Sequence, residues 1–220
     1  MKRIITNDEY LKEMSRCIAE INKMKKEAIS LTADIISDTL YEEDFFFSSA
    51  VDRSVALMEG MKVMLEIRNL TCIGVILRAQ IDNCMRLFAV YIAADKNDLI
   101  KNFIEGNPIN KLKDNLGRKM TDALLKERLS EYDPTIKAVY ENASGHVHLS
   151  DKALYSSIAG ISTEKDENAY IEVSVGLPLK ESANAILIEA AEAFIHFLHL
   201  QYKLLMPVAK SKKVLECNNL

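Results

Sequence analysis

Arg78, Asp82 and Arg86 are the first residues whose types and spacing could do chemistry. They follow one another at intervals of four in the segment GVILRAQIDNCMRLFAVY, and this spacing places them on one face of a helix. We call these three residues the arginine stripe. Unpaired charges in so apolar a segment are costly, so we expect them to pair with one another, with a neighbouring helix or with a ligand. The alternatives are an ion ladder that fixes helix register and a site where two guanidinium groups bind an anion such as phosphate.

A second candidate is a group of four residues that we call the histidine segment: Tyr140, Ser144, His146 and His148. We expect a break between short helices here, and in an extended break His146 and His148 would point the same way. Such a pair could ligate a metal, or one histidine could act as a general base with the other as its helper. No cysteine lies close enough in sequence to complete a structural zinc site. The alternative is that these side chains only cap and pack the turn.

The third candidate is a polar stripe in the C-terminal apolar segment. Glu189, Glu192, His196 and His199 follow one another at intervals of three, four and three residues. A di-metal site in a helical bundle uses Glu-x-x-His motifs on two helices. Here Glu192 and His196 are four residues apart and the pair occurs once, so Glu192, His196 and His199 are weak metal candidates. The spacing favours the solvent-facing line of an amphipathic helix.

The sequence excludes several function classes. It contains no P-loop, GxGxxG, GxSxG or HExxH motif, which sets aside the motif-defined nucleotide hydrolases, dehydrogenases and esterases. The 28 Lys and Arg against 32 Asp and Glu give a net charge of −4. Only a local basic patch could therefore attract nucleic acid. The residues do not point to any one cofactor, and they leave open whether the protein is an enzyme.

The elements that position these side chains are predicted to be helices. The chain of 220 residues has only 7 Gly and 4 Pro and is 49% hydrophobic, which favours long helices around one core. The expected elements are a long helix over 7–40, central helices over 48–94, short helices over 95–155, a β-hairpin over 156–176 and a last helix over 181–206. We predict one mainly all-α domain over residues 1–220. It is a multi-helix bundle with a central apolar helix and a small β-hairpin insertion before the C-terminal helix.

The sequence also bears on the compartment. The N-terminal apolar stretch ends at Thr6, too early for a signal-peptide core, and the four cysteines form no CxxC motif. Charged residues and histidines interrupt the apolar runs before they reach the roughly 18 residues of a membrane span. We therefore expect a cytoplasmic protein that does not enter a membrane.

Two short motifs carry a resemblance to known proteins. The run LRAQID at residues 77–82, followed by Arg86 and Leu87, and the run SGHVH at residues 144–148 resemble those of bacterial helical domains of unknown function. The resemblance covers about residues 50–155, and these domains are similar in architecture to the HEPN superfamily of helical nucleotide-binding and ribonuclease domains. It implies a helical fold. It does not extend to the HEPN nuclease motif, an Arg followed four to six residues later by His, which this sequence lacks.

Three functional hypotheses remain. The first is a bacterial accessory protein, in stress response or phage defence, that binds a small anionic ligand or a nucleotide in a pocket formed by the arginine stripe and the histidine segment. The second is a divergent ribonuclease in which His146 or His148 is the general base and Arg78 stabilises charge on the phosphate. The third is a helical homo-oligomerisation module whose charged groups form only a buried network. Contact between the stripe and the segment would favour a shared site, and wide separation would favour the module.

Overall fold

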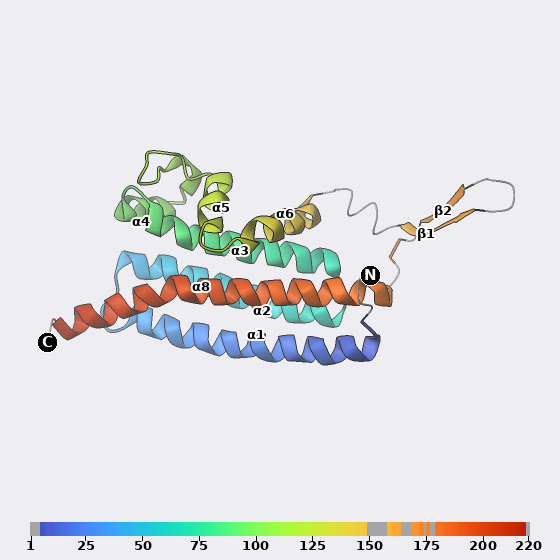
Figure 1. The fold of residues 1–220 in the computed structure, drawn as a ribbon. Helices are drawn as coiled ribbons and strands as arrows, with labels where there is room; N and C mark the ends of the chain where they lie inside the picture. The colour runs from blue at the N-terminus through green and yellow to red at the C-terminus, as the bar shows by residue number, and fades with distance from the viewer. Residues whose placement is uncertain (1–4, 149–157, 164–168, 174, 177–178, 219–220) are drawn as a thin grey trace.

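Four long helices lie side by side in the described part of the chain: α1 (Asn7–Ile36), α2 (Glu42–Glu66), α3 (Leu70–Ile92) and α8 (Asn184–Asn218) (Figure 1). The computed structural model describes residues 5–148, 158–163, 169–173, 175–176 and 179–218. In it α1 packs against α2 and α8, and α3 packs against α2 and α8 from the other side. The prediction of a mainly helical bundle is confirmed.

The helix α1 begins at a capping box. The Thr6 side chain accepts a hydrogen bond from the Glu9 backbone N–H, and the Glu9 side chain accepts one from the Thr6 backbone N–H. Its buried side chains recur at helical spacing, so that one face joins the core. The helix ends before Ser37, whose φ is 46°, and not at residue 40 as expected from the absence of Pro and Gly.

The start of α2 differs from its expected position near residue 48. The helix already begins at Glu42, because its first turn is acidic and the Asp44 carboxylate accepts the Tyr41 backbone N–H. Phe46 and Phe47, which interrupt the apolar periodicity, are both buried and meet edge to face with ring centroids 5.4 Å apart. The segment is therefore the first turns of a core helix.

The helix α3 is the central helix, as its nearly all-round apolar sequence predicts. It packs against α2, α8, α5 and α6, and most of its side chains are buried. Asn69 caps its N-terminus by accepting the Cys72 backbone N–H. This burial leaves the charged arginine stripe on the face that meets the short helices.

Short elements cover the outer side of α3 (Figure 1). They are α4 (Lys96–Ile104), the 3₁₀ turn η1 (Ile109–Lys111), α5 (Asp122–Ser130) and α6 (Thr135–Val147). Asp95 caps α4 and Thr121 caps α5, each through its side-chain oxygen. Both α5 and α6 pack on α3 and on each other, so they determine what surrounds the arginine stripe.

Two short strands precede the last helix. β1 (Ile158–Thr163) and β2 (Ala169–Val173) pair antiparallel, with Ile161 opposite Ile171 and an irregularity between Ile158 and Gly160. The turn expected between them, at residues 164–168, lies outside the described residues. The 3₁₀ turn η2 (Glu181–Ala183) leads into α8.

The helix α8 continues past Pro207, although the sequence predicts an end at residue 206. Ala209 and Lys212, which follow the proline, are both buried. The Lys212 ammonium group is ion-paired with the buried Asp44 carboxylate at the start of α2. These contacts hold the last turns in place despite the proline.

Among the described residues, one helix is long and apolar enough to cross a membrane by length and composition. Within Glu181–Val214, an 18-residue window reaches a mean hydropathy of 1.3 with at most two charged residues. The expectation that charges interrupt every apolar run too early is therefore wrong by this measure. Half of that window is buried inside the bundle, and core helices of soluble proteins pass the same test, so the finding is weak evidence for a membrane span.

Candidate functional site

Three guanidinium groups surround the Asp82 carboxylate on α3. Its Oδ1 lies 3.3 Å from Nη2 of Arg86 and 4.0 Å from Nη1 of Arg78. Its Oδ2 accepts a hydrogen bond of 3.3 Å from Nη1 of Arg53 on α2. The side chains of Arg78 and Asp82 are only 16% and 20% exposed, so the expected pairing inside a poorly solvated region is confirmed. We call Arg53, Arg78, Arg86 and Asp82 the arginine cluster.

A second carboxylate reaches the cluster from α5. Asp122, the first residue of that helix, accepts a hydrogen bond of 2.5 Å from Nη2 of Arg86. The same guanidinium group therefore contacts both Asp82 and Asp122. Three positive charges meet two negative ones here, which leaves the group with an excess of positive charge.

Tyr140 on α6 joins the histidine segment to the arginine stripe. Arg78 donates a hydrogen bond of 2.5 Å from Nη2 to the Tyr140 hydroxyl, and its guanidinium carbon lies 3.8 Å from the centroid of the ring. The Lys126 ammonium group on α5 lies 4.9 Å from the same centroid and 3.4 Å from the Glu141 carboxylate. The Tyr140 ring thus receives two cations, an arrangement that its negative π-face favours.

His146 packs on the backbone of α3 at Gly74. A Cβ atom built on Gly74 would lie 2.4 Å from Cγ of the imidazole, closer than real Cβ contacts come. Gly74 stands four residues before Arg78 and thus on the same face of α3. His146 therefore lies one helical turn before Arg78 on this face, and the contact between the histidine segment and the arginine stripe is made by Tyr140.

The histidine segment itself is not the turn that the sequence predicts. Residues 135–147 form α6, and Gly145 lies inside it. Within this helix the Ser144 hydroxyl donates to the Tyr140 carbonyl oxygen over 2.7 Å. His148 is the exposed C-cap residue. The helix rotates the two histidines apart, so they do not form a pair pointing the same way, and only His146 reaches α3.

The polar stripe of α8 meets three different partners. Glu192 pairs with Arg16 over 2.5 Å, His196 with Asp133 over 2.5 Å, and His199 lies 3.7 Å from Glu20. All three are on the exposed side of the helix. Among the described residues, no group of three or more His, Cys, Asp and Glu side chains could hold a metal ion. This stripe is therefore the solvent-facing line of an amphipathic helix.

Asp133 connects α8 to the start of α6. Burial alone would raise the pKa of its carboxyl, but hydrogen bonds from Thr135 and His196 outweigh burial and lower the pKa below its usual value. Thr135 donates from both its backbone N–H, over 3.1 Å, and its hydroxyl, over 2.6 Å. This charged group thus fixes the beginning of the helix that carries Tyr140 and His146.

Several residues of the site were missed by sequence reasoning. Arg53, Asp122 and Lys126 come from other helices, and no spacing relative to the arginine stripe marks them. Gly74 did carry a signal, because a glycine inside an apolar helix often marks a close approach of another group. Its position four residues before Arg78 could have placed that approach on the stripe.

Buried polar side chains on the opposite side of α3 form a network with α2 and α8. The Gln201 side-chain oxygen accepts hydrogen bonds from Gln80 over 2.6 Å and from Asn83 over 3.3 Å. Ser54 donates to the Gln80 side-chain oxygen over 3.0 Å, and Asn83 donates to the Ala50 carbonyl over 2.7 Å. These groups satisfy one another, so the network is structural.

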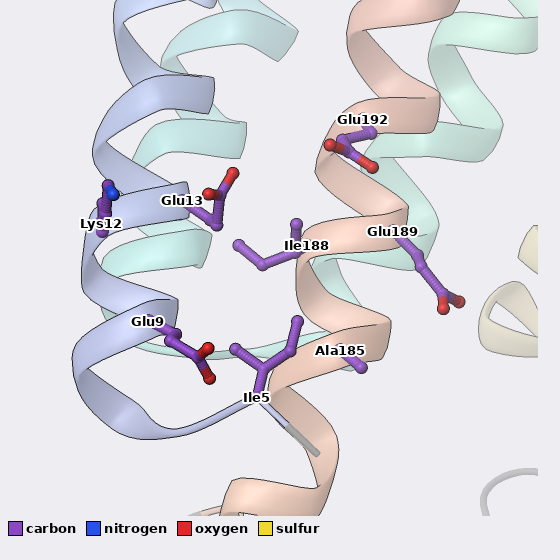
Figure 2. A pocket seen from close by; sticks show the side chains of 8 residues that line it. All are labelled: Ile5, Glu9, Lys12, Glu13, Ala185, Ile188, Glu189 and Glu192. Atoms are coloured by element: carbon purple, nitrogen blue, oxygen red, sulfur yellow. The ribbon is translucent and has the colours of Figure 1, made fainter. Parts of the chain in front are cut away.

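A separate cavity of about 640 Å³ lies between the N-terminal parts of α1 and α8 (Figure 2). In Figure 2, Glu13 and Ile188 point into this space, whereas Glu189 points away from α1. Glu192 is a predicted metal candidate that lines the cavity. Arg16 bridges Glu13 and Glu192 over 2.7 and 2.5 Å, so each of these carboxylates already has an ionic partner.

Comparison with known proteins does not place this chain in a family. No protein-family model, curated protein or solved structure matches the chain. The arginine cluster and the side chains that α5 and α6 bring to it are the features of this chain that bear on its function.

Proposed function

We propose that this protein binds a small anionic ligand, of the class of phosphate or a nucleotide, at the arginine cluster where α5 and α6 pack on α3. The observation that carries the proposal is the gathering of three guanidinium groups around the single carboxylate of Asp82. Guanidinium groups bind phosphate through paired, charge-assisted hydrogen bonds. A purely structural ion pair needs one partner for each charge, and this cluster has more cations than anions.

The surroundings of the cluster support a ligand that enters from solvent. Arg53 is 46% exposed and Arg86 is 27% exposed, whereas Arg78 lies deeper against Tyr140. An anion could therefore contact the outer two guanidinium groups first and reach Arg78 behind them. His146 of α6 lies against α3 one helical turn from Arg78, where an imidazole N–H could donate to an oxygen of a larger ligand.

Calorimetric titration with inorganic phosphate and with adenosine mono- and triphosphate tests the proposal. We expect saturable binding to the native protein and a rise in melting temperature with ligand concentration. Arg78→Gln should weaken binding by about tenfold or more, because it removes a charge-assisted hydrogen bond. His146→Ala should weaken it without unfolding the protein.

Arg16→Gln is the matched control for these variants. Arg16 on α1 also contacts two carboxylates, those of Glu13 and Glu192, but these lie on α1 and α8 and neither belongs to the arginine cluster. Its variant should bind like the native protein. Absence of binding to the native protein, or an equal loss in Arg16→Gln and Arg78→Gln, would overturn the proposal.

A second candidate function is RNA cleavage. The observation that favours it is the position of His146 one helical turn from Arg78 on the same face of α3. An imidazole can act as a general base, and a guanidinium group can stabilise charge on a phosphodiester. Cleavage of a single-stranded RNA that disappears in His146→Ala, while phosphate binding by Arg78 persists, would establish it.

A further inference from the structure

We infer that Asp82 competes with the ligand for the three guanidinium groups and so makes the site select polyphosphates over single phosphate groups. This inference rests on the proposed function, because it concerns the same arginine cluster. It assigns Asp82 the role of a specificity-determining residue, which the ion pairs alone do not require.

The geometry places Asp82 where a bound anion would lie. Arg78 and Arg86 both approach its Oδ1, at 4.0 and 3.3 Å, and Arg53 approaches its Oδ2 at 3.3 Å. The carboxylate thus occupies the point on which all three cations converge. An entering anion must share these cations with Asp82 and is repelled by its charge at short range.

Ligand charge and length decide how well an anion meets this competition. One phosphate group can contact only one or two of the guanidinium groups while Asp82 holds the centre. A chain of two or three phosphate groups can pass around the carboxylate and contact Arg53, Arg78 and Arg86 at separate oxygens. It can also approach the Lys126 ammonium group, which contacts the same Tyr140 ring as Arg78.

The same arrangement makes recognition of a base unnecessary. Within the described part of the chain, Tyr140 is the aromatic side chain found in contact with the cluster, and its ring already receives Arg78 and Lys126. A ring used in this way does not offer a free stacking surface for a nucleobase. The ligand class is therefore defined by the phosphate chain.

Titration of the native protein with orthophosphate, pyrophosphate and tripolyphosphate at low ionic strength is the first test. We expect tripolyphosphate to bind at least about tenfold more tightly than orthophosphate, and about as tightly as adenosine triphosphate. Asp82→Asn removes the competing charge and keeps the shape. It should strengthen orthophosphate binding by about tenfold and reduce the preference for tripolyphosphate.

Asp34→Asn is the matched control, because it makes the same change on α1, where the carboxylate pairs with Lys213 over 3.0 Å. It should leave both affinities unchanged. If circular dichroism shows that Asp82→Asn does not fold, two other measurements test the inference. They are the ratio of tripolyphosphate to orthophosphate affinity in the native protein and the affinities of Arg53→Gln. Arg53→Gln should lose more affinity for tripolyphosphate than for orthophosphate.

The outcomes separate this inference from the proposed function. Failure of every anion to bind the native protein and Asp82→Asn would end both. Equal affinity of the native protein for orthophosphate and tripolyphosphate, or an unchanged orthophosphate affinity in folded Asp82→Asn, would overturn the inference and leave an anion site in place.

Discussion

The imidazole of His146 lies against the backbone of Gly74, so that α6 approaches α3 at a point where no other residue type fits. A Cβ atom on Gly74 would be 2.4 Å from the ring. We predict that Gly74→Ala lowers the free energy of unfolding by about 1–3 kcal/mol, because α6 must shift to make room. Urea denaturation of the native protein and the variant measures the change.

Gly60→Ala on α2 is the control for this prediction. Its Cβ atom would meet only the end of the Ile76 side chain, at 3.3 Å, and alanine favours a helix over glycine by about 1 kcal/mol. This variant should be neutral or more stable. Combining Gly74→Ala with His146→Ala should recover stability, and no recovery would contradict the contact as the cause.

Replacement of Asp82 by Ala should destabilise the fold, because it leaves Arg53, Arg78 and Arg86 facing one another. We expect a loss of about 2 kcal/mol or more, below the value of roughly 3–5 kcal/mol for fully buried pairs because the cluster is partly solvated. Thermal and urea unfolding measure it. Asp34→Ala on the surface should change stability by less than about 0.5 kcal/mol, and a similar small change for Asp82→Ala would contradict the prediction.

Two ion pairs lie at the end of α8, Lys212 with Asp44 and Lys213 with Asp34. Loss of the buried Lys212–Asp44 pair should lower the free energy of unfolding more than loss of the other. Both side chains are almost fully buried, and Asp44 also accepts the Tyr41 backbone N–H. Lys212→Met leaves a buried carboxylate without its counter-charge and should cost about 3–5 kcal/mol. Urea denaturation at neutral pH provides the measurement.

Lys213→Met provides an adjacent control. Lys213 pairs with Asp34 on the surface, where the two side chains are 59% and 42% exposed, and such pairs contribute about 0–1 kcal/mol. The Lys212→Met/Asp44→Leu double variant should recover much of the lost stability, since apolar groups can replace a buried pair. Equal effects of the two lysine variants would contradict the assignment.

Stability should fall in acid partly through Asp133. The hydrogen bonds from Thr135 and His196 hold the pKa of its carboxyl below the usual value near 3.9. Its contribution is therefore present above that usual value and is lost as the pH falls through the lower pKa of the folded state. Urea denaturation between pH 7 and pH 3 should show Asp133→Asn destabilised at neutral pH and closer to the native protein at the acid end. A constant difference across this range would exclude this linkage.

The central position of α3 could be predicted from sequence, because a helix that is apolar nearly all round must be covered on every side. The pairing of Arg78 with Asp82 within this helix could be predicted for the same reason, since charges in an apolar helix need partners. The start of α2 could not be predicted by the same logic. Phe46 and Phe47 break the spacing of one face, but Phe46 packs on Phe103 of α4 and both rings are buried.

The partners of the arginine stripe could not be predicted, because spacing within one helix does not show how its neighbours rotate about it. Arg53, Asp122 and Lys126 meet the stripe only after α2 and α5 have packed on α3. The sequence predicts a break between short helices at the histidine segment, whereas α6 continues to Val147 with Gly145 inside it. Contacts of Tyr140 and His146 with α3 stabilise α6 enough to outweigh the modest helical penalty of one glycine.

The hydrogen bonds of Gln201 have a consequence for the order in which this chain can fold. Its partners Gln80 and Asn83 precede it by 121 and 118 residues, so their side-chain amide groups lack this partner until the last helix is present. A nascent chain on the ribosome therefore lacks the groups that complete its interior until synthesis is almost finished. Closing so long a loop is slow, and a protein truncated before α8 is expected to remain incompletely folded and prone to aggregation.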